Sequence, residues 1–138
     1  MLELTIDASE VAENLSDLVN KYPDKIKNAL EKVCLFIEEE AKAEAPVRDG
    51  QLVGSISHEV GENEGSVFAR AEYAPYVEFG TGIFAKNGNG RKDVPWRYED
   101  SKGWHTTYGQ VAQPFLEPAA MNHQKEILDI FVDALGMN

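Results

Sequence analysis

The sequence predicts an α+β fold, in which a small antiparallel sheet of about four strands carries a long helix and a C-terminal helix packed on one face. Apolar residues recur every three or four positions towards both ends of the chain and every second position in the middle. The strand-like segments are neighbours joined by short glycine-containing turns, which favours antiparallel pairing. A chain of 138 residues has the length of one ordinary domain, so residues 1–138 are expected to form a single domain.

Two helices are expected before the first strand. Ser9 can cap the first helix, whose apolar residues share one face: Val11, Leu15, Leu18, Val19 and Tyr22. The second helix is expected over residues 23–45 and ends before Pro46. This helix has an apolar stripe along one face. Leu35 lies opposite the stripe and is either an ordinary surface leucine or a contact with a neighbouring subunit. Cys34 flanks the stripe and is expected to be a small core residue. The stripe consists of Ile26, Leu30, Val33, Ile37 and Ala41.

The apolar period changes to two after this helix. We expect a strand from Leu52 to Val60, a turn over residues 61–65 and a returning strand that ends at Tyr73. His58 shares a face of the first strand with apolar neighbours, as expected for a partly buried sheet histidine with a local hydrogen bond.

A second hairpin and a last helix complete the expected elements. The hairpin strands, 96–99 and 104–107, flank a turn in which Gly103 supplies a positive φ. The helix starts at Pro118 and stops at Gly136. Its apolar face consists of Ala120, Ile127, Leu128, Phe131, Ala134 and Leu135.

Composition restricts the partners of the chain. The 24 Asp and Glu residues against 13 Lys and Arg give a net charge of −11, so we expect no specific nucleic-acid binding. The apolar runs are too short to span a bilayer, so no membrane contact is expected. The start of the chain lacks the basic and apolar pattern of a signal peptide, and the lone cysteine cannot form an internal disulfide. Both features favour synthesis in a reducing cytoplasm.

Candidate catalytic chemistry is sparse. The three histidines are scattered in the sequence and there is one cysteine, so no metal site is expected. The glycine run near residue 88 is not placed between a strand and a helix, as a phosphate-binding loop would be, so no cofactor is expected. The alternative from another functional class is a small hydrolase that uses His105 with Asp100 or Glu78. Alanine at His105 and Glu78 would largely preserve assembly of a structural protein but would abolish turnover by an enzyme.

Residues 81–113 differ in character from the rest of the chain, and we call them the arm. They hold five basic and three acidic residues together with both tryptophans. Trp, Tyr and Arg are the residues that anchor protein interfaces, and a connection of this length in a compact domain is usually functional. The arm is therefore expected to be an extended loop that contacts other protein subunits, with a nucleic-acid platform as a second possibility. The predicted interface residues are Tyr76, Glu78, Phe79, Trp96, Arg97, Trp104 and Phe115, with Glu78 and Arg97 as charge partners.

The segment just before the arm carries a motif. Residues 73–82 have the sequence Tyr-Ala-Pro-Tyr-Val-Glu-Phe-Gly-Thr-Gly, in which Pro75 begins one helical turn and Gly80 can take a left-handed cap. Tyr76 and Phe79 lie on one side of that turn. Glu78 is its only charge, with three candidate roles: a general base, a capping group or a partner for an arginine.

This motif and a second one downstream resemble a known family. Residues 113–119 have the sequence Gln-Pro-Phe-Leu-Glu-Pro-Ala. Upstream, Ala45-Pro46 is followed by residues 49–56, which also resemble that family except that Asp49 stands where its members commonly have threonine. Together they closely resemble the tail-component family of long-tailed bacteriophages, the neck or tail-completion proteins at the head-to-tail junction. The resemblance covers about residues 40–120.

The resemblance implies a structural role without an enzymatic step. It implies an α+β subunit, made in the cytoplasm of a bacterial host, that assembles into a homo-oligomeric ring at the head–tail junction or tail of the virion and contacts other neck and tail proteins. In such a ring the arm is expected to become ordered when it meets neighbouring copies.

Overall fold

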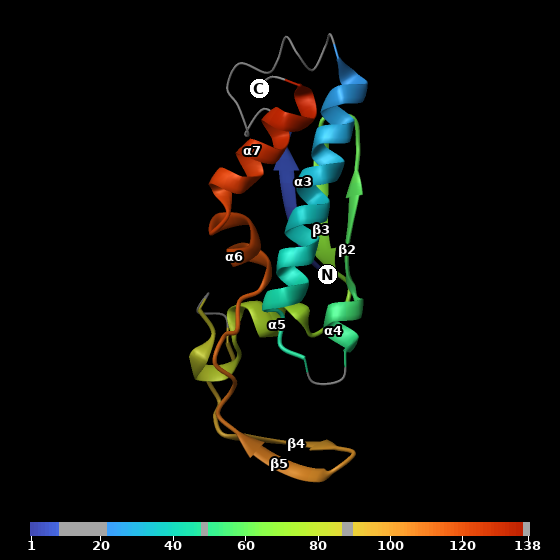
Figure 1. Ribbon diagram of the computed structural model, residues 1–138. Coiled ribbons are helices and arrows are strands. Elements are labelled where there is room, and N and C mark those ends of the chain that lie inside the picture. The colour runs from blue at the N-terminus through green and yellow to red at the C-terminus, as the bar shows by residue number, and fades with distance from the viewer. Residues whose placement is uncertain (9–21, 48–49, 87–89, 137–138) are drawn as a thin grey trace.

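The computed structural model describes residues 1–8, 22–47, 50–86 and 90–136, so the helix predicted from Ser9 lies outside the described residues. The chain is α+β, as predicted, with helices on one face of a three-stranded antiparallel sheet and a separate two-stranded hairpin (Figure 1). The elements are β1 (Leu2–Asp7), α3 (Pro23–Glu44), α4 (Gln51–Gly54), β2 (Ile56–Val60), β3 (Glu64–Ala69), α5 (Ala74–Phe79), the 3-10 turn η1 (Gly82–Phe84), β4 (Trp96–Asp100), β5 (Gly103–Thr107), α6 (Leu116–Met121) and α7 (Gln124–Leu135).

The three-stranded sheet has the order β1-β3-β2, with every pair antiparallel. Its strand β1 was not predicted from the sequence, although Leu2, Leu4 and Ile6 alternate with polar residues there. These three residues face the core opposite β3, where Leu4 pairs with Val67. The hairpin β4–β5 forms a sheet of its own, so the expected set of about four strands is divided into three and two.

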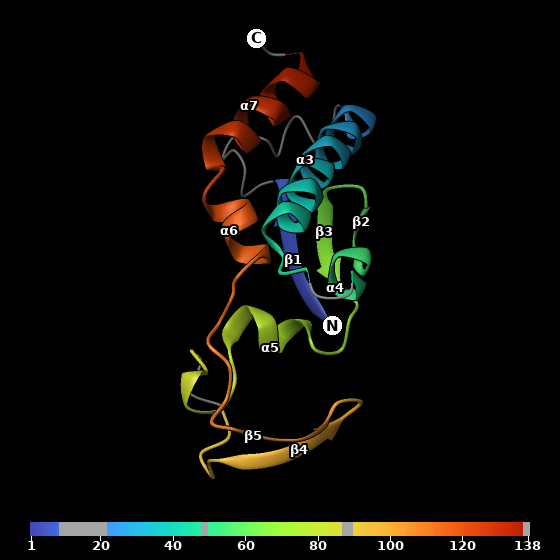
Figure 2. The same ribbon diagram turned by 60° about the horizontal axis from the view of Figure 1, so that its bottom comes forward.

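The long helix α3 covers the sheet, and α6 and α7 pack beside it (Figure 2). All five residues of its predicted apolar stripe are fully buried, and Leu35 is exposed. Cys34 is buried against the sheet at Gly65, where a Cβ atom would overlap the thiol sulfur. Burial, together with the negative charge of Glu31, raises the pKa of Cys34 to about 12, so the thiol is a core group, as predicted.

Two predicted boundaries are wrong around the first hairpin. The predicted strand from Leu52 begins with the helical turn α4 instead, because Ser55 Oγ bonds the Leu52 carbonyl oxygen at 2.8 Å and closes that turn. The returning strand ends at Ala69, and the chain turns before reaching Tyr73.

The predicted C-terminal helix is divided into α6 and α7 by a break at residues 122–123. His123 at the break lies 3.3 Å from a carboxylate oxygen of Glu40 and packs edge-on against Phe36, so α7 is fastened to α3 at its start. Leu128, predicted to be on the buried face, is 43% exposed, whereas Phe131 and Leu135 are buried. Gly136 ends α7 in the left-handed conformation, as predicted.

Candidate functional site: the arm and its anchor

We call the three-stranded sheet and the helices packed on it the body. The arm leaves the body as two backbone segments that run side by side. The Thr81 N–H donates to the Gln110 carbonyl oxygen at 2.9 Å, and the Ile83 N–H donates to the Tyr108 carbonyl oxygen at 3.2 Å. The Gln110 N–H donates in return to Thr81 Oγ1 at 2.8 Å. We call this paired segment the stem. Beyond it the hairpin β4–β5 stands away from the sheet and helices in both ribbon views (Figures 1 and 2).

Glycine is required where the two backbones of the stem touch. At Gly82, with φ +61°, a Cβ atom would overlap the Tyr108 carbonyl oxygen. At Gly109, with φ +123°, it would overlap the Thr81 carbonyl oxygen. The Gly-Thr-Gly end of the motif therefore serves close backbone approach. Gly80 also has a positive φ, but its ψ of 174° is extended, so it does not form the predicted left-handed cap.

Glu78 anchors the far end of the arm to the body. Its carboxylate is only 3% exposed and accepts three backbone hydrogen bonds at the start of α6. Oε1 accepts from the N–H groups of Phe115 and Leu116, at 3.0 and 2.9 Å, and Oε2 accepts from that of Glu117 at 3.1 Å. Of the three predicted roles of Glu78, capping is the one that the structure shows, and the capped helix begins 38 residues further along the chain.

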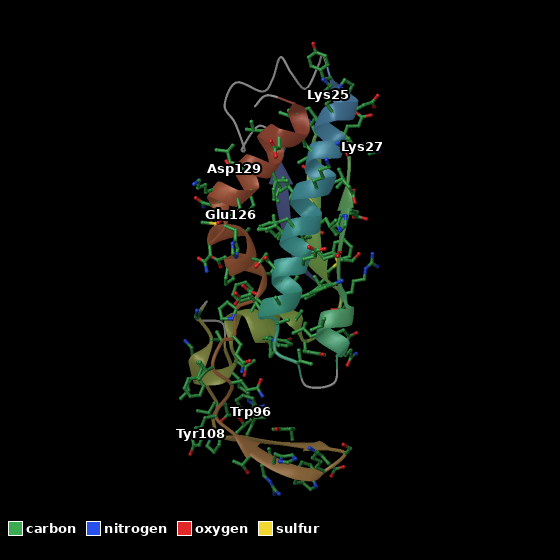
Figure 3. All side chains as sticks on the ribbon, in the orientation of Figure 1. Lys25, Lys27, Trp96, Tyr108, Glu126 and Asp129 are labelled. Carbon is green, nitrogen blue, oxygen red and sulfur yellow. The ribbon has the colours of Figure 1, made fainter. Side chains whose placement is uncertain are left out.

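Three of the predicted interface residues line one groove. Tyr76 and Phe79 on α5 and Trp96 at the start of β4 face a hollow of about 380 Å³, which we call the arm groove. The Arg91 guanidinium also lines it, 5.0 Å from the centre of the Trp96 ring. Figure 3 shows Trp96 and Tyr108 where the stem meets the hairpin. The arm groove therefore combines aromatic walls with a positive charge.

Two further predicted residues lie on the hairpin. The Arg97 guanidinium lies 5.2 Å from the centre of the Trp104 ring, and Trp104 is 60% exposed. On the other face His105 stacks on Tyr98, with 5.2 Å between ring centres. The two strands pack mainly on each other. A two-stranded hairpin of this kind is marginally stable in water, so it gains stability from any surface that covers it.

The remaining predicted residue, Phe115, is fully buried in the core beside the anchor. The seven predicted residues therefore form three groups: the arm groove, the exposed hairpin pair and the buried anchor. Each group contains an aromatic residue, and only tertiary packing distinguishes the buried Phe115 from the exposed Trp104.

The hydrolase alternative depends on Glu78 or Asp100 acting beside His105. Both carboxylate oxygens of Glu78 bind backbone N–H groups, and His105 stacks on Tyr98 in the hairpin. Asp100 ends β4, and its side chain is not among those described. Within the described ranges, no three His, Cys, Asp or Glu side chains are placed to hold a metal ion. No helix among these residues is long and apolar enough to cross a membrane.

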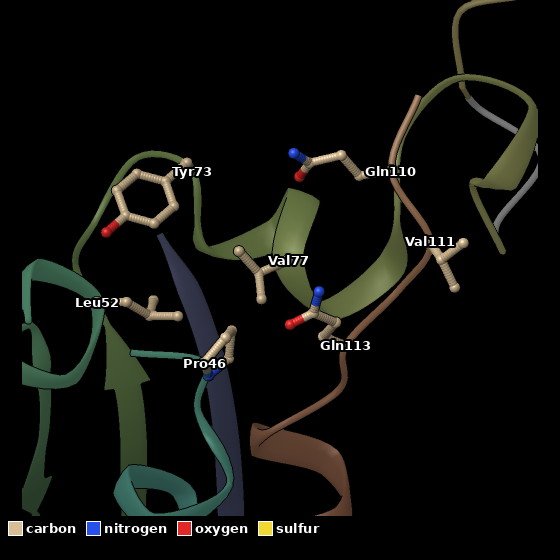
Figure 4. A pocket seen from close by; sticks show the side chains of 7 residues that line it. All are labelled: Pro46, Leu52, Tyr73, Val77, Gln110, Val111 and Gln113. Carbon is tan, nitrogen blue, oxygen red and sulfur yellow. The ribbon is translucent and has the colours of Figure 1, made fainter. Parts of the chain in front are cut away.

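A second hollow, of about 340 Å³, lies on the body side of α5 (Figure 4). Pro46, Leu52, Tyr73 and Val77 form its apolar wall, and Gln110 and Gln113 reach it from the returning segment of the arm. The described lining therefore consists of apolar side chains and two amides, which suits the binding of an apolar group. This hollow was not predicted, because its apolar residues lie in separate segments of the sequence and each has the pattern of a core residue.

His58 has two charged partners, Glu31 and Glu38, that were not predicted from the sequence. Nδ1 lies 3.0 Å from Glu38 Oε1, and Nε2 lies 2.5 Å from Glu31 Oε1. Both ring nitrogens face carboxylates, which the doubly protonated imidazolium satisfies. Burial would lower the pKa of His58, but the hydrogen bonds and charges of the two glutamates outweigh it and raise the pKa above 6.5. The predicted partly buried histidine thus ties the edge strand β2 to α3.

Comparison with known proteins agrees with the resemblance seen in the motifs. Residues 9–80 match a family model described as "Bacteriophage HK97-gp10, putative tail-component". The match includes the motif up to Gly80 and ends where the arm begins. The comparisons with curated proteins and with solved structures gave no match. Because the family model covers more than half of the 138 residues, the chain belongs to the HK97-gp10 family of bacteriophage tail components.

Proposed function

We propose that this protein is a structural subunit of the head–tail junction, a neck or tail-completion protein that assembles into a ring of identical copies in the virion. It contacts other neck and tail proteins there and catalyses no reaction. Membership of a tail-component family supports the structural role. The arm supports assembly through contacts between copies.

The observation that carries this proposal is the concentration of exposed apolar side chains in and beside the arm. Seven large apolar residues between positions 76 and 111 are each at least 42% exposed: Tyr76, Ile83, Phe84, Tyr98, Trp104, Tyr108 and Val111. Full burial of one such side chain is worth about 1.5–3 kcal/mol. A monomer that stays alone rarely exposes so many of them in one region.

Charge supports an identical copy as the partner. The arm has five basic and three acidic residues, whereas the remainder of the chain has 8 basic and 21 acidic residues. The arm of one copy is therefore attracted to the body of another. The predicted charge partner Arg97 is exposed on the hairpin, where it can take part in such a contact.

Replacement of the hairpin tests the proposal. Residues 96–107 are exchanged for an Asn-Gly turn, which the close pairing of Trp96 with Thr107 permits. The variant is supplied to a phage that lacks its own copy, and particles are counted by electron microscopy and plaque titre. Junctions are expected to be missing, while circular dichroism shows a folded body.

A matched control is Leu35→Ala, which removes an exposed apolar side chain from α3. It is expected to leave particle number and infectivity unchanged. Normal junctions in the hairpin-less variant would disprove the role of the arm. Loss of infectivity in the Leu35 control would instead place a subunit contact on α3.

A further inference from the structure

The turn between β2 and β3 is an exposed acidic loop, and we call residues 59–64 the acidic turn. Glu59, Glu62 and Glu64 line a hollow of about 470 Å³ there, and no basic residue among those that the structure describes lines it with them. Among the described residues none of these three carboxylates forms an ion pair. The loop is narrow, because the Gly61 N–H closes it by donating to the Glu64 carbonyl oxygen at 2.7 Å.

The arm groove has the complementary chemistry. The Arg91 guanidinium lies over Trp96 at one side of the groove, with Lys92 next to it in the chain. The acidic group near Arg91 is Asp93, at 3.9 Å, and its side chain is 96% exposed. Such a solvent-exposed pair contributes little, so an incoming carboxylate can displace it. The aromatic rings of Tyr76, Phe79 and Trp96 provide the apolar contact area around that charge.

The two features lie at opposite ends of the molecule. In both ribbon views the turn joining β2 to β3 is near the start of α3, and the arm is at the other end (Figures 1 and 2). A chain therefore cannot fill its own groove with its own turn. A contact between the two joins different surfaces of two copies, which is the head-to-tail arrangement from which closed rings are built.

We infer that the arm groove of one copy binds the acidic turn of the next copy, with Arg91 and Lys92 facing Glu62 and Glu64. This inference rests on the proposed function, because it names the partner surface for the arm. Aromatic walls exclude water around the ion pairs and strengthen them. The narrow loop, flanked by Gly61 and Gly65, brings no bulky apolar side chain that would have to be buried elsewhere.

Charge reversal tests this inference in the full-length protein. Arg91→Glu with Lys92→Glu, and separately Glu62→Lys with Glu64→Lys, place like charges against each other. Each pair is expected to lower the titre of complemented phage at least about 100-fold, since like charges across an interface cost several kcal/mol. All four substitutions in one chain restore opposite charges and are expected to recover the titre to within about 10-fold of the unmodified protein.

Matched controls reverse charges elsewhere on the body (Figure 3). Lys125→Glu, and separately Glu126→Lys with Asp129→Lys, alter exposed residues of α7 and are expected to leave the titre unchanged. If the arm reversal is harmful but the turn reversal is not, the inference is overturned while the role of the arm stands. Failure of the combined variant to recover also overturns it, provided that thermal unfolding shows a folded chain.

Cysteine cross-linking gives a second readout that does not depend on infectivity. A chain with Glu62→Cys and Arg91→Cys is expected to form a ladder of disulfide-linked copies when assembled particles are oxidised, whereas either single variant is not. Cys34 is buried, so it does not contribute. A chain with Glu126→Cys and Arg91→Cys is the negative control. If the chain with Glu62→Cys and Arg91→Cys forms normal particles but no ladder of linked copies, the inference is overturned.

Discussion

Removal of the Glu78 carboxylate is expected to destabilise the protein strongly, because it is buried and accepts three backbone hydrogen bonds. In Glu78→Ala, the N–H groups of Phe115 and Leu116 stay buried without a partner, since these two residues are at most 3% exposed. Each unsatisfied buried group costs about 1–3 kcal/mol. Glu117 is exposed, so its N–H can bind water. For the two groups together, the free energy of unfolding should therefore fall by about 2–6 kcal/mol.

Glu78→Gln separates the charge from the hydrogen bonds. Its amide oxygen can still accept from Phe115 and Leu116, but the NH₂ group faces the Glu117 N–H and the negative charge at the start of α6 is lost. We expect a loss of about 1–2 kcal/mol. Urea unfolding followed by circular dichroism measures both variants, with the exposed Glu72→Ala as the control. An alanine variant within about 0.5 kcal/mol of the unmodified protein would refute the anchoring role.

Four further outcomes are expected. The pKa of His58 is raised in the folded protein, so its ion pairs stabilise the fold fully below pH 6.5, and this stabilisation is lost as the pH rises through the folded pKa. His58→Gln should remove this part of the pH dependence of stability, measured as the urea concentration at the unfolding midpoint. Gly82→Ala should cost more than about 2 kcal/mol in thermal unfolding, whereas Gly103→Ala, which also has a positive φ but meets no neighbour, should cost about 1–2 kcal/mol. Cys34, with its pKa of about 12, should resist a thiol reagent at pH 8 until the chain is unfolded in urea. His105→Ala should leave particle titre unchanged, and a large drop in titre with a folded chain and normal junctions in electron micrographs would reopen the hydrolase alternative.

The Glu78 anchor changes one expectation drawn from the sequence. Alanine at Glu78 and His105 was expected to leave assembly of a structural protein largely intact. The structure shows that Glu78→Ala removes a cap at the base of the arm, so a loss of assembly in that variant does not indicate catalysis. His105→Ala, with junctions counted by electron microscopy beside the titre, is therefore the variant that compares the two functional classes.

Local periodicity explains which parts of the fold were predictable. The stripe on α3 and the hairpin β4–β5 follow from spacings within one segment, and both match the structure. Strand β1 was missed because its partner β3 is about 60 residues further along the chain, so no neighbouring segment indicated a pairing. The break between α6 and α7 was missed because His123 is held there by residues of α3.

The site shows the same division between local and long-range information. Aromatic and basic composition located the arm, and three predicted residues do line the arm groove. Glu78 caps a helix that begins 38 residues later, and His58 binds carboxylates that are 20 and 27 residues earlier in the chain. No spacing pattern in the sequence indicates such distant pairs. Packing alone places Phe115 inside and Trp104 outside.

The stem has a practical consequence for engineering. Since backbone meets backbone at Gly82 and Gly109, the crossing point fixes the spacing of the two outgoing segments whatever sequence follows them. Any insert whose ends match that spacing can therefore be grafted beyond the stem while the rest of the protein stays unchanged. Hairpins taken from other viruses are one such insert.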